Sequence, residues 1–226
     1  MYLYKSIYEY AEAEYIVEKS RFIAHASPAE NTEEAKLFIA GIKEKYKDAT
    51  HNVPAFICGA GMEHQWASDD GEPQGTSGMP ILKLISALEL TNIAIVVTRY
   101  FGGIKLGTGG VARAYTHAAK LAIERAGICE VREGICLEYS FDYTYLSRIQ
   151  NMSEEGRFVI EDISYTDVIG AKLSCMSEEV AAVKSLLADI TGGKASLNDE
   201  QLVLAKYRLQ AESGSVLENI KTEIKK

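Results

Sequence analysis

Hydrophobic residues in the first 130 positions follow, by turns, the two-residue period of strands and the wider period of helices. Strand-forming residues dominate four segments: residues 15–26, 53–60, 65–68 and 92–98. The second and third of these are expected to pair as a hairpin across a turn at residues 59–61. Helical spacing of apolar residues predicts three helices: residues 31–46, 81–88 and 111–126. The strand at 92–98 is apolar at five consecutive positions, so we expect both of its faces to be covered.

The ends of these helices carry residues with a known capping role. Asn31 or Thr32 would cap the first helix, because their side chains accept hydrogen bonds from its free amides. Pro80 fits the first turn of the second helix, and Gly127 would end the third in a left-handed conformation.

A second series of elements begins after residues 129–134, where the pattern resets. We predict a strand, a helix, two strands, a helix and a strand: residues 135–141, 143–152, 158–165, 168–175, 178–190 and 195–207. This β-α-β-β-α-β order is that of a ferredoxin-like unit. A short charged helix is expected after Ser213. The predicted fold class is therefore α+β, with two domains at residues 1–130 and 131–226 and no long tether between them.

The composition is that of an ordinary globular protein, with 226 residues of which 47% are apolar and 25% charged. No run approaches the roughly 18 apolar residues of a membrane helix, and the first residues lack the apolar core of a signal peptide. We therefore expect a cytoplasmic protein without a membrane partner. The four cysteines form no C-x-x-C pair and no histidine stands at metal-ligand spacing, so we expect no metal, disulfide framework or cofactor.

The net charge of −8 argues against bulk attraction to nucleic acid or anionic lipid. Between Gly75 and His117, however, four basic residues stand against a single acid, Glu89, which gives a local balance of +3. These basic residues are Lys83, Arg99, Lys105 and Arg113. Any binding of phosphate should therefore be local and should involve this part of the chain.

The basic segment contains a glycine-rich stretch, Arg99–Gly110, directly after the strand at 92–98. Glycine allows a positive φ and lets another group approach the backbone closely, and a helix beginning near Gly110 would offer free amides to an anion. Arg99, Lys105 and Arg113 would supply charge-assisted bonds. The candidate ligand-binding residues are Arg99, Gly102, Gly103, Lys105, Gly107, Gly109, Gly110 and Arg113. The alternative is that these glycines only shape a long connection against the core.

Neither of the common nucleotide-binding motifs is present in this stretch. It lacks the Gly-Lys-Ser/Thr of a P-loop, and Gly107–Ala112 fits the dinucleotide pattern G-x-G-x-x-A only loosely. The connection between strand and helix is also much longer than the tight turn of a dinucleotide fold. The sequence therefore gives little support for nucleotide binding of these kinds.

A second candidate site is an acidic turn with Asp69, Asp70 and Glu72 in a loop rich in glycine and proline. Carboxylates grouped in this way can hold a hard cation or a general base, and His51 stands near the start of the preceding hairpin. The alternative is that the aspartates bond to loop amides and cap the helix that follows. No G-x-S-x-G elbow and no Cys/His signature points to covalent catalysis.

Three stretches of the sequence resemble the Impact family, in its bacterial YigZ type: Lys19–Ala24, Ser68–Ile81 and Val97–Tyr115. The resemblance implies an N-terminal domain similar to the second domain of a small-subunit ribosomal protein and a C-terminal domain that resembles modules of elongation factor G. Eukaryotic Impact proteins bind a translation-control scaffold and restrain an initiation-factor kinase pathway. They carry a different N-terminal module, which is not found in this sequence.

These observations lead to two hypotheses about function. In the first, the chain is a non-enzymatic, translation- or stress-associated regulator that contacts RNA, a ribosome-associated factor or an acidic protein surface through the glycine-rich basic loop. In the second, it is a small-molecule enzyme in which Asp69, Asp70, Glu72 and His51 act on a phosphate-bearing substrate. The carboxylates and the loop amides would then line one closed pocket. A third hypothesis is that the chain is a purely structural or oligomeric module. The sequence does not determine the oligomeric state.

Overall fold

The structure is a computed structural model, and it describes residues 2–209. Within them the chain forms two compact units, which we call the N-terminal and C-terminal domains. The N-terminal domain comprises residues 4–130 with residues 207–209, and the C-terminal domain comprises residues 131–206 with residues 2–3. The predicted α+β fold with two domains is confirmed.

The N-terminal domain is built on a five-stranded antiparallel sheet with the strand order β2-β3-β6-β4-β5. Its strands are β2 (Ala11–Val17), β3 (Ser20–Pro28), β4 (His51–Cys58), β5 (His64–Ala67) and β6 (Ile93–Tyr100). β6 lies in the middle of the sheet, and every residue from Ile93 to Arg99 is buried. The prediction of a strand covered on both faces is therefore confirmed, and so is the hairpin of β4 and β5.

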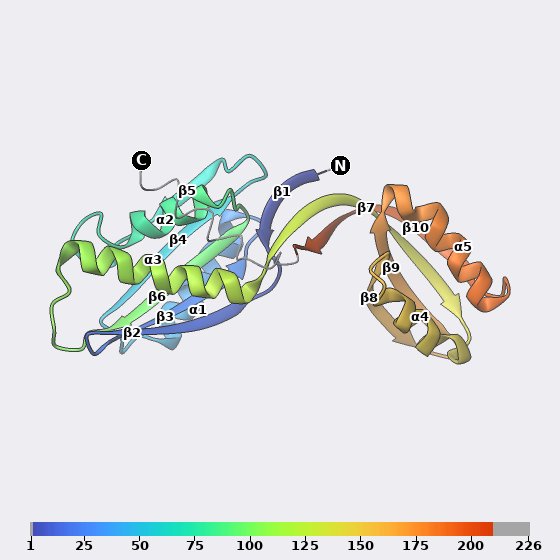
Figure 1. Ribbon diagram of the computed structural model, residues 1–226, viewed down its shortest axis with the longest axis horizontal. Coiled ribbons are helices and arrows are strands. Elements are labelled where there is room, and N and C mark those ends of the chain that lie inside the picture. The colour runs from blue at the N-terminus through green and yellow to red at the C-terminus, as the bar shows by residue number, and fades with distance from the viewer. Residues whose placement is uncertain (1, 210–226) are drawn as a thin grey trace. The chain divides into compact units, whose positions relative to one another are not determined.

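Helices cover both faces of this sheet (Figure 1). α1 (Thr32–Lys45) packs on one face, where it meets Ala94 and Val96 of β6. α2 (Gly78–Ala87) and α3 (Gly107–Ala126) pack on the other face and enclose the larger core of the domain. The residues of α3 that enter this core are mainly alanines, whose small side chains allow the helix to lie close to the sheet.

The start of α1 is determined by a reciprocal cap. Asn31 Oδ1 accepts a hydrogen bond of 2.9 Å from the backbone N–H of Glu34. The carboxylate of Glu34 in turn accepts bonds from Asn31 Nδ2 and from the backbone N–H of Glu30, at 2.8 and 2.9 Å. Asn31 is one of the two caps predicted from the sequence, and the helix ends at its C-cap Tyr46, as expected.

The segment 15–26, which we expected to be one strand, is divided between the two strands of a hairpin. Val17 pairs with Ser20, so Glu18 and Lys19 form a two-residue turn. Both turn residues have a positive φ, at 46° and 60°. Turns of this kind favour Asn-Gly or Asp-Gly, so the sequence gives no sign of a turn at this point.

The C-terminal domain contains a second sheet and two helices. Its elements are β7 (Ile128–Phe141), α4 (Leu146–Ser153), β8 (Phe158–Tyr165), β9 (Ile169–Met176), α5 (Val180–Thr191) and β10 (Ser196–Arg208), with 3-10 turns at Tyr143–Tyr145 and Ser177–Glu179. The strands pair in the order β10-β7-β9-β8, and the predicted β-α-β-β-α-β order is confirmed. β1 (Tyr2–Ile7) also pairs with β7.

Two expectations for this half of the chain need comment. β7 begins at Ile128 and not at Ile135, because the strand continues through the residues at which the hydrophobic pattern resets. The helix expected after Ser213 lies outside the described residues. Within residues 2–209, no helix is both long enough and apolar enough to cross a membrane.

His25 lies on β3, and its side chain has no exposed surface. Its Nδ1 is 3.1 Å from Tyr10 Oη and 3.3 Å from the carboxylate of Glu12, while Nε2 has no partner among the described residues. Burial outweighs the attraction of Glu12 and lowers the pKa of His25 from 6.5 to about 4. The imidazole is therefore neutral in the folded protein at neutral pH.

We expect the protein to lose stability as the pH falls from 6.5 to about 4, because His25 takes up a proton in the unfolded chain before it does so in the folded one. The folded pKa is the lower of the two, so the loss begins near the unfolded pKa and amounts to about 3 kcal/mol at most. Urea denaturation of the wild type and of His25→Leu across this range measures the effect. The same pH dependence in both proteins would contradict it.

Candidate functional site

The glycine-rich stretch joins β6 to α3, and the helix begins at Gly107, earlier than the predicted start near Gly110. Leu106 stands at the N-cap position, where no side chain accepts a hydrogen bond from the first turn. The first backbone N–H groups of an α-helix have no acceptor within the helix, and they carry a partial positive charge. This end of α3 therefore has the donors that an anion requires.

Several glycines in the stretch have a structural role. An added Cβ on Gly102 would lie 2.0 Å from the backbone carbon of Lys19 and 2.4 Å from the backbone nitrogen of Ser20, so Gly102 packs directly on the β2–β3 turn. Gly103 and Gly107 have positive φ values, 85° and 69°. For these three residues, the fold itself requires glycine.

Gly109 differs from the other glycines, because neither its backbone nor its packing requires the absence of a side chain. Its φ is not in the positive range, and an added Cβ would meet only the tip of the Arg113 side chain, at 3.6 Å. At Gly110 the fit is tighter, since a Cβ would lie 3.1 Å from the Cβ of Leu106. The open space at Gly109 leaves the start of α3 accessible from outside.

A cavity of about 400 Å³ is lined by the acidic loop, the sheet and the start of α3. Most of its exposed wall is apolar. We call it the polar pocket after the polar side chains among its lining residues, and define it by six of these residues: Thr50, His51, Glu72, Arg99, Phe101 and Thr108. Lys105, Leu106 and Gly107 also line it. The structure therefore brings part of the acidic loop and part of the glycine-rich stretch to a single cavity.

Arg99, which we expected to supply a charge-assisted bond to a ligand, lies in the interior with only 5% of its surface exposed. Its Nη1 donates a hydrogen bond of 2.5 Å to Glu72 Oε1. The guanidinium also lies 5.3 and 5.5 Å from the ring centroids of Phe22 and Phe101. Its Nε is buried and has no partner among the described residues. Arg99 can thus reach a ligand only inside the polar pocket.

Glu72 joins three elements of the domain at one carboxylate, of which 5% is exposed. Besides Arg99 of β6, it accepts a hydrogen bond of 2.8 Å from the hydroxyl of Tyr115 on α3. Burial, together with the charge of Glu72 and this bond, raises the pKa of Tyr115. The phenol therefore stays protonated and acts as a donor.

His51 faces the same carboxylate from β4. Its Nε2 is 3.8 Å from Glu72 Oε1, and its Nδ1 is 2.7 Å from the carbonyl oxygen of Asp70. A carbonyl oxygen can only accept, so Nδ1 carries a proton and donates it to this bond. In the neutral imidazole, Nε2 is then free to accept a hydrogen bond on the side of the polar pocket.

The two aspartates of the acidic loop serve the loop itself. Asp69 accepts bonds from the backbone N–H groups of Gly75, Ser77 and Gly78 and from the Ser77 hydroxyl. Burial acts to raise the pKa of Asp69, but these bonds together lower it. Asp70 accepts from the backbone N–H of Asn52 and from Lys43. Neither aspartate lines the polar pocket, so only Glu72 and His51 of the suggested catalytic group reach a common cavity.

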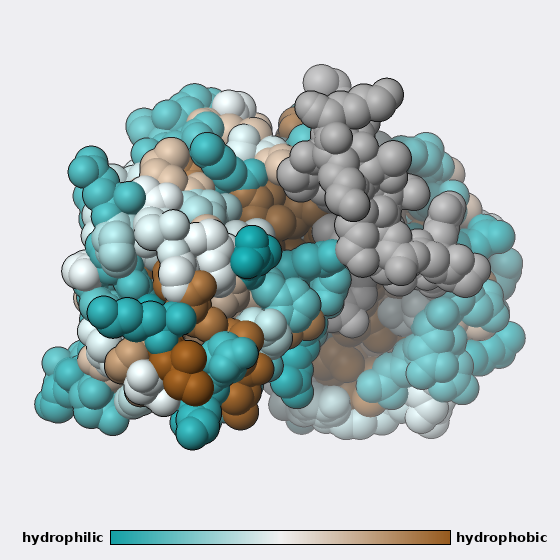
Figure 2. All heavy atoms as spheres, turned by 60° about the vertical axis from the view of Figure 1, so that its left-hand side comes forward, coloured by the Kyte–Doolittle hydropathy of each residue, from teal (hydrophilic) through white to brown (hydrophobic). Residues whose placement is uncertain are grey.

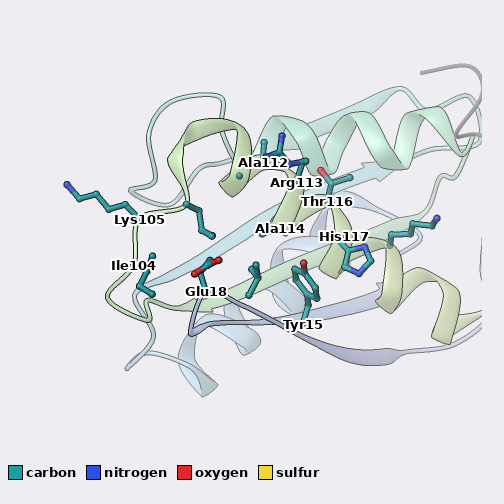
Figure 3. A pocket seen from close by; sticks show the side chains of 13 residues that line it. Tyr15, Glu18, Ile104, Lys105, Ala112, Arg113, Ala114, Thr116 and His117 are labelled. Atoms are coloured by element: carbon teal, nitrogen blue, oxygen red, sulfur yellow. The ribbon is translucent and has the colours of Figure 1, made fainter. Parts of the chain in front are cut away.

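A second hollow, an open groove of about 1120 Å³, runs between α3 and β2 (Figure 3). We call it the α3 groove and define it by Tyr15, Glu18, Lys105, Arg113, His117 and Lys120. The last three stand four and three positions apart and so share one face of the helix. Sequence reasoning named Arg113 but missed Lys120, although helical spacing from Arg113 could have found it.

Apolar side chains also reach the surface near both hollows. Phe101, which lines the polar pocket, is 47% exposed, and Ile104, which lines the α3 groove, is 40% exposed. Figure 2 turns this end of the N-terminal domain toward the viewer and shows apolar atoms at the surface among hydrophilic ones. A ligand here would therefore meet apolar as well as charged groups.

The protein is thus a two-domain α+β protein with a groove lined by basic side chains and a separate pocket in its N-terminal domain. The Impact N-terminal domain matches residues 18–123, and a domain of unknown function (DUF1949) matches residues 140–194. The chain is 36% identical over 202 residues to the IMPACT family member YvyE of Bacillus subtilis, covering 89% of this chain and 93% of YvyE. It belongs to the IMPACT family, as its sequence motifs indicated.

Other relatives agree with this assignment. The chain is 31% identical over 185 residues to the IMPACT family member YigZ of Escherichia coli, covering 80% of this chain and 90% of YigZ. Protein IMPACT of Mus musculus is 33% identical over only 112 residues, 35% of its length. A crystal structure of a hypothetical protein, 27% identical, superposes with a TM-score of 0.56 and covers 94% of this chain.

Replacing Glu72 should destabilise the protein strongly. Glu72→Ala leaves the charge of Arg99 buried without a partner, so we expect the free energy of unfolding to fall by about 3–5 kcal/mol. Tyr115→Phe removes one hydrogen bond and keeps the ion pair, and it should cost about 1 kcal/mol. Urea denaturation measures both. Equal losses in the two variants would show that the ion pair does not hold the loop.

Two glycines offer a matched pair of alanine substitutions with opposite effects. Gly102→Ala forces a Cβ into the β2–β3 turn and should lower the free energy of unfolding by about 1–3 kcal/mol. Gly109→Ala places a Cβ in open space within a helix and should raise it by about 0.5–1 kcal/mol. Thermal and urea denaturation compare them, and a destabilised Gly109→Ala would contradict the open site.

Proposed function

We propose that the protein is a non-enzymatic, translation-associated regulator that binds the phosphate groups of RNA in its α3 groove. The observation that carries the proposal is the row of basic side chains along one face of α3, beside the basic loop that precedes the helix. The proposal combines the first hypothesis from the sequence with the groove in the structure, and we propose that the protein acts in the cytoplasm.

The chemistry of the groove supports RNA as the ligand. Arg113 and His117 are exposed, and Lys105 is exposed on the connection from β6. Lys120 is 3.8 Å from Glu124, a surface pair that contributes little and so leaves Lys120 available. On a chain of net charge −8, this is a local concentration of positive charge, as phosphate contacts require.

An aromatic ring completes the groove. Tyr15 of β2 packs edge-on against His117, with ring centroids 4.5 Å apart (Figure 3). A basic groove with an aromatic side chain is the combination by which many proteins hold single-stranded RNA, because the bases stack while the cations meet the phosphates. The groove therefore suits a single strand.

Family membership supports the link to translation but not a particular partner. The resemblance to eukaryotic Impact proteins implies a role in translational control. The match to the mouse protein covers 35% of that protein and 47% of this chain, so most of the mouse protein lies outside the match. We therefore propose the ligand from the groove and not from the partners of those relatives.

The test is the salt dependence of binding to a single-stranded RNA oligonucleotide, followed by fluorescence anisotropy. Arg113→Ala/Lys120→Ala should weaken binding and should make the slope of log affinity against log salt shallower by about 1.4, since each phosphate contact on a single strand contributes about 0.7. Lys36→Ala/Lys47→Ala removes the same charge from α1 and the residues that follow it, away from the groove, and should leave the slope unchanged.

Each outcome of this experiment bears on the proposal. An equal loss of RNA affinity in both double variants would mean that binding depends only on the net charge of the protein. Unchanged RNA binding in Arg113→Ala/Lys120→Ala would refute the proposal. If poly-glutamate binds in place of RNA and the groove variant abolishes that binding, the α3 groove serves an acidic protein surface instead.

A further inference from the structure

We propose that the polar pocket is a second binding site, which takes the terminal phosphate group of a phosphate monoester. The pocket and the α3 groove lie on two sides of the start of α3 and share only Lys105 and Leu106 among their lining residues. This proposal does not depend on RNA binding in the groove, because the groove residues Arg113 and Lys120 do not line the pocket.

Hydrogen-bond donors without an acceptor lie at one side of the pocket, at the start of α3. Gly107 and Thr108 line it and belong to the first turn of α3, whose backbone N–H groups have no acceptor in the helix. The hydroxyl of Thr108 and the ammonium group of Lys105 have no partner among the described residues. Together these groups would surround an oxyanion placed at the end of the helix.

Arg99 provides an independent observation inside the same pocket. It is 5% exposed, it lines the cavity, and within the described residues its guanidinium donates only to Glu72 while its buried Nε has no acceptor. A guanidinium has five N–H donors, and leaving one buried without a partner is costly. The Nε itself has almost no accessible surface, so an anion in the pocket would meet the part of the guanidinium that lines the cavity, as well as the helix end.

The charge balance of the pocket favours an anion. Arg99 neutralises Glu72 at a contact of 2.5 Å, so the remaining charge comes from Lys105 and from the partial positive charge of the helix end. His51 adds an acceptor at Nε2, which would take a hydroxyl or a phosphate proton of the ligand.

The number of donors favours phosphate over carboxylate. A phosphate monoester presents three terminal oxygens that accept strong hydrogen bonds, whereas a carboxylate presents two in one plane. Backbone amides and a hydroxyl of Gly107 and Thr108 lie at the start of α3, and the guanidinium of Arg99 lies on β6, so donors come from two elements, which suits a tetrahedral group. Phe101, Leu106 and Val111 supply apolar walls for the rest of the ligand.

Phosphate monoesters can come from two sources, a phosphorylated small molecule or the 5′ end of an RNA strand. The volume of about 400 Å³ accommodates a small molecule. The adjoining groove would equally allow the end of a bound strand to enter the pocket. The site chemistry is the same in both cases, so the experiment has one arm for each source.

The first arm follows the backbone amide signals of residues 107–110 by NMR as inorganic phosphate is added at constant ionic strength. We expect saturable shifts in the wild type. Thr108→Val removes a hydroxyl donor that lines the pocket and nearly keeps the shape of the side chain, and it should weaken phosphate binding by about tenfold or more. Arg113→Ala, in the groove, is the matched control and should change the affinity by less than about twofold.

The second arm compares RNA oligonucleotides of one sequence with a 5′-phosphate or a 5′-hydroxyl. If the phosphorylated strand binds more tightly and Thr108→Val abolishes this preference, the pocket binds RNA ends. Equal binding of the two strands, with phosphate binding intact in the first arm, assigns it to phosphorylated small molecules.

The proposal is overturned if residues 107–110 do not respond to phosphate, or if the pocket variant binds phosphate as well as the wild type does. Loss of phosphate binding in Arg113→Ala alone would also overturn it, because the ion would then occupy the groove. Circular dichroism and thermal denaturation of each variant distinguish a misfolded protein from the expected loss of binding. If the wild type binds phosphate but no single-stranded RNA, the proposed function is refuted and the pocket proposal stands.

Discussion

The buried contact between Glu72 and Arg99 is the interaction that holds together the part of the N-terminal domain around the polar pocket. It connects a long loop without regular structure to the central strand, and through Tyr115 to α3. Removing two charges from water is costly, and the contact compensates for that cost only while both partners are present. The loop can therefore keep its path only as long as the strand and the helix stay in place.

The rest of the acidic loop is organised around this point. Asp69 accepts a hydrogen bond from the backbone N–H of Gly78 at the start of α2. Asp70 accepts hydrogen bonds from the backbone N–H of Asn52 in β4 and from Lys43 of α1. His51 is oriented by the carbonyl group of Asp70. Each of the three carboxylates of the loop thus accepts hydrogen bonds from its own set of donors, and these bonds fix the loop as a wall of the polar pocket.

Features with strong local signals could be predicted from the sequence. The five apolar positions of β6, the cap at Asn31 and the order of elements in the C-terminal domain all depend on residues close together in the chain. The burial of Arg99 could not be predicted, because its partner Glu72 lies 27 positions away and a basic residue at a strand end has the same pattern whether it turns inward or outward. The turn at Glu18 was missed because its residues are atypical of such turns.

The packing of Gly102 on the β2–β3 turn has a consequence for how this region could be transplanted. The three motif stretches are far apart in the chain, yet they meet through the contact of Gly102 with Lys19, through the rings of Phe22 and Tyr115 at 5.1 Å, and through the contact of Glu72 with Arg99. A designer who moved the glycine-rich loop alone to another scaffold would move a segment without the surfaces that shape it. The three stretches are one module in space, and they would have to be grafted together.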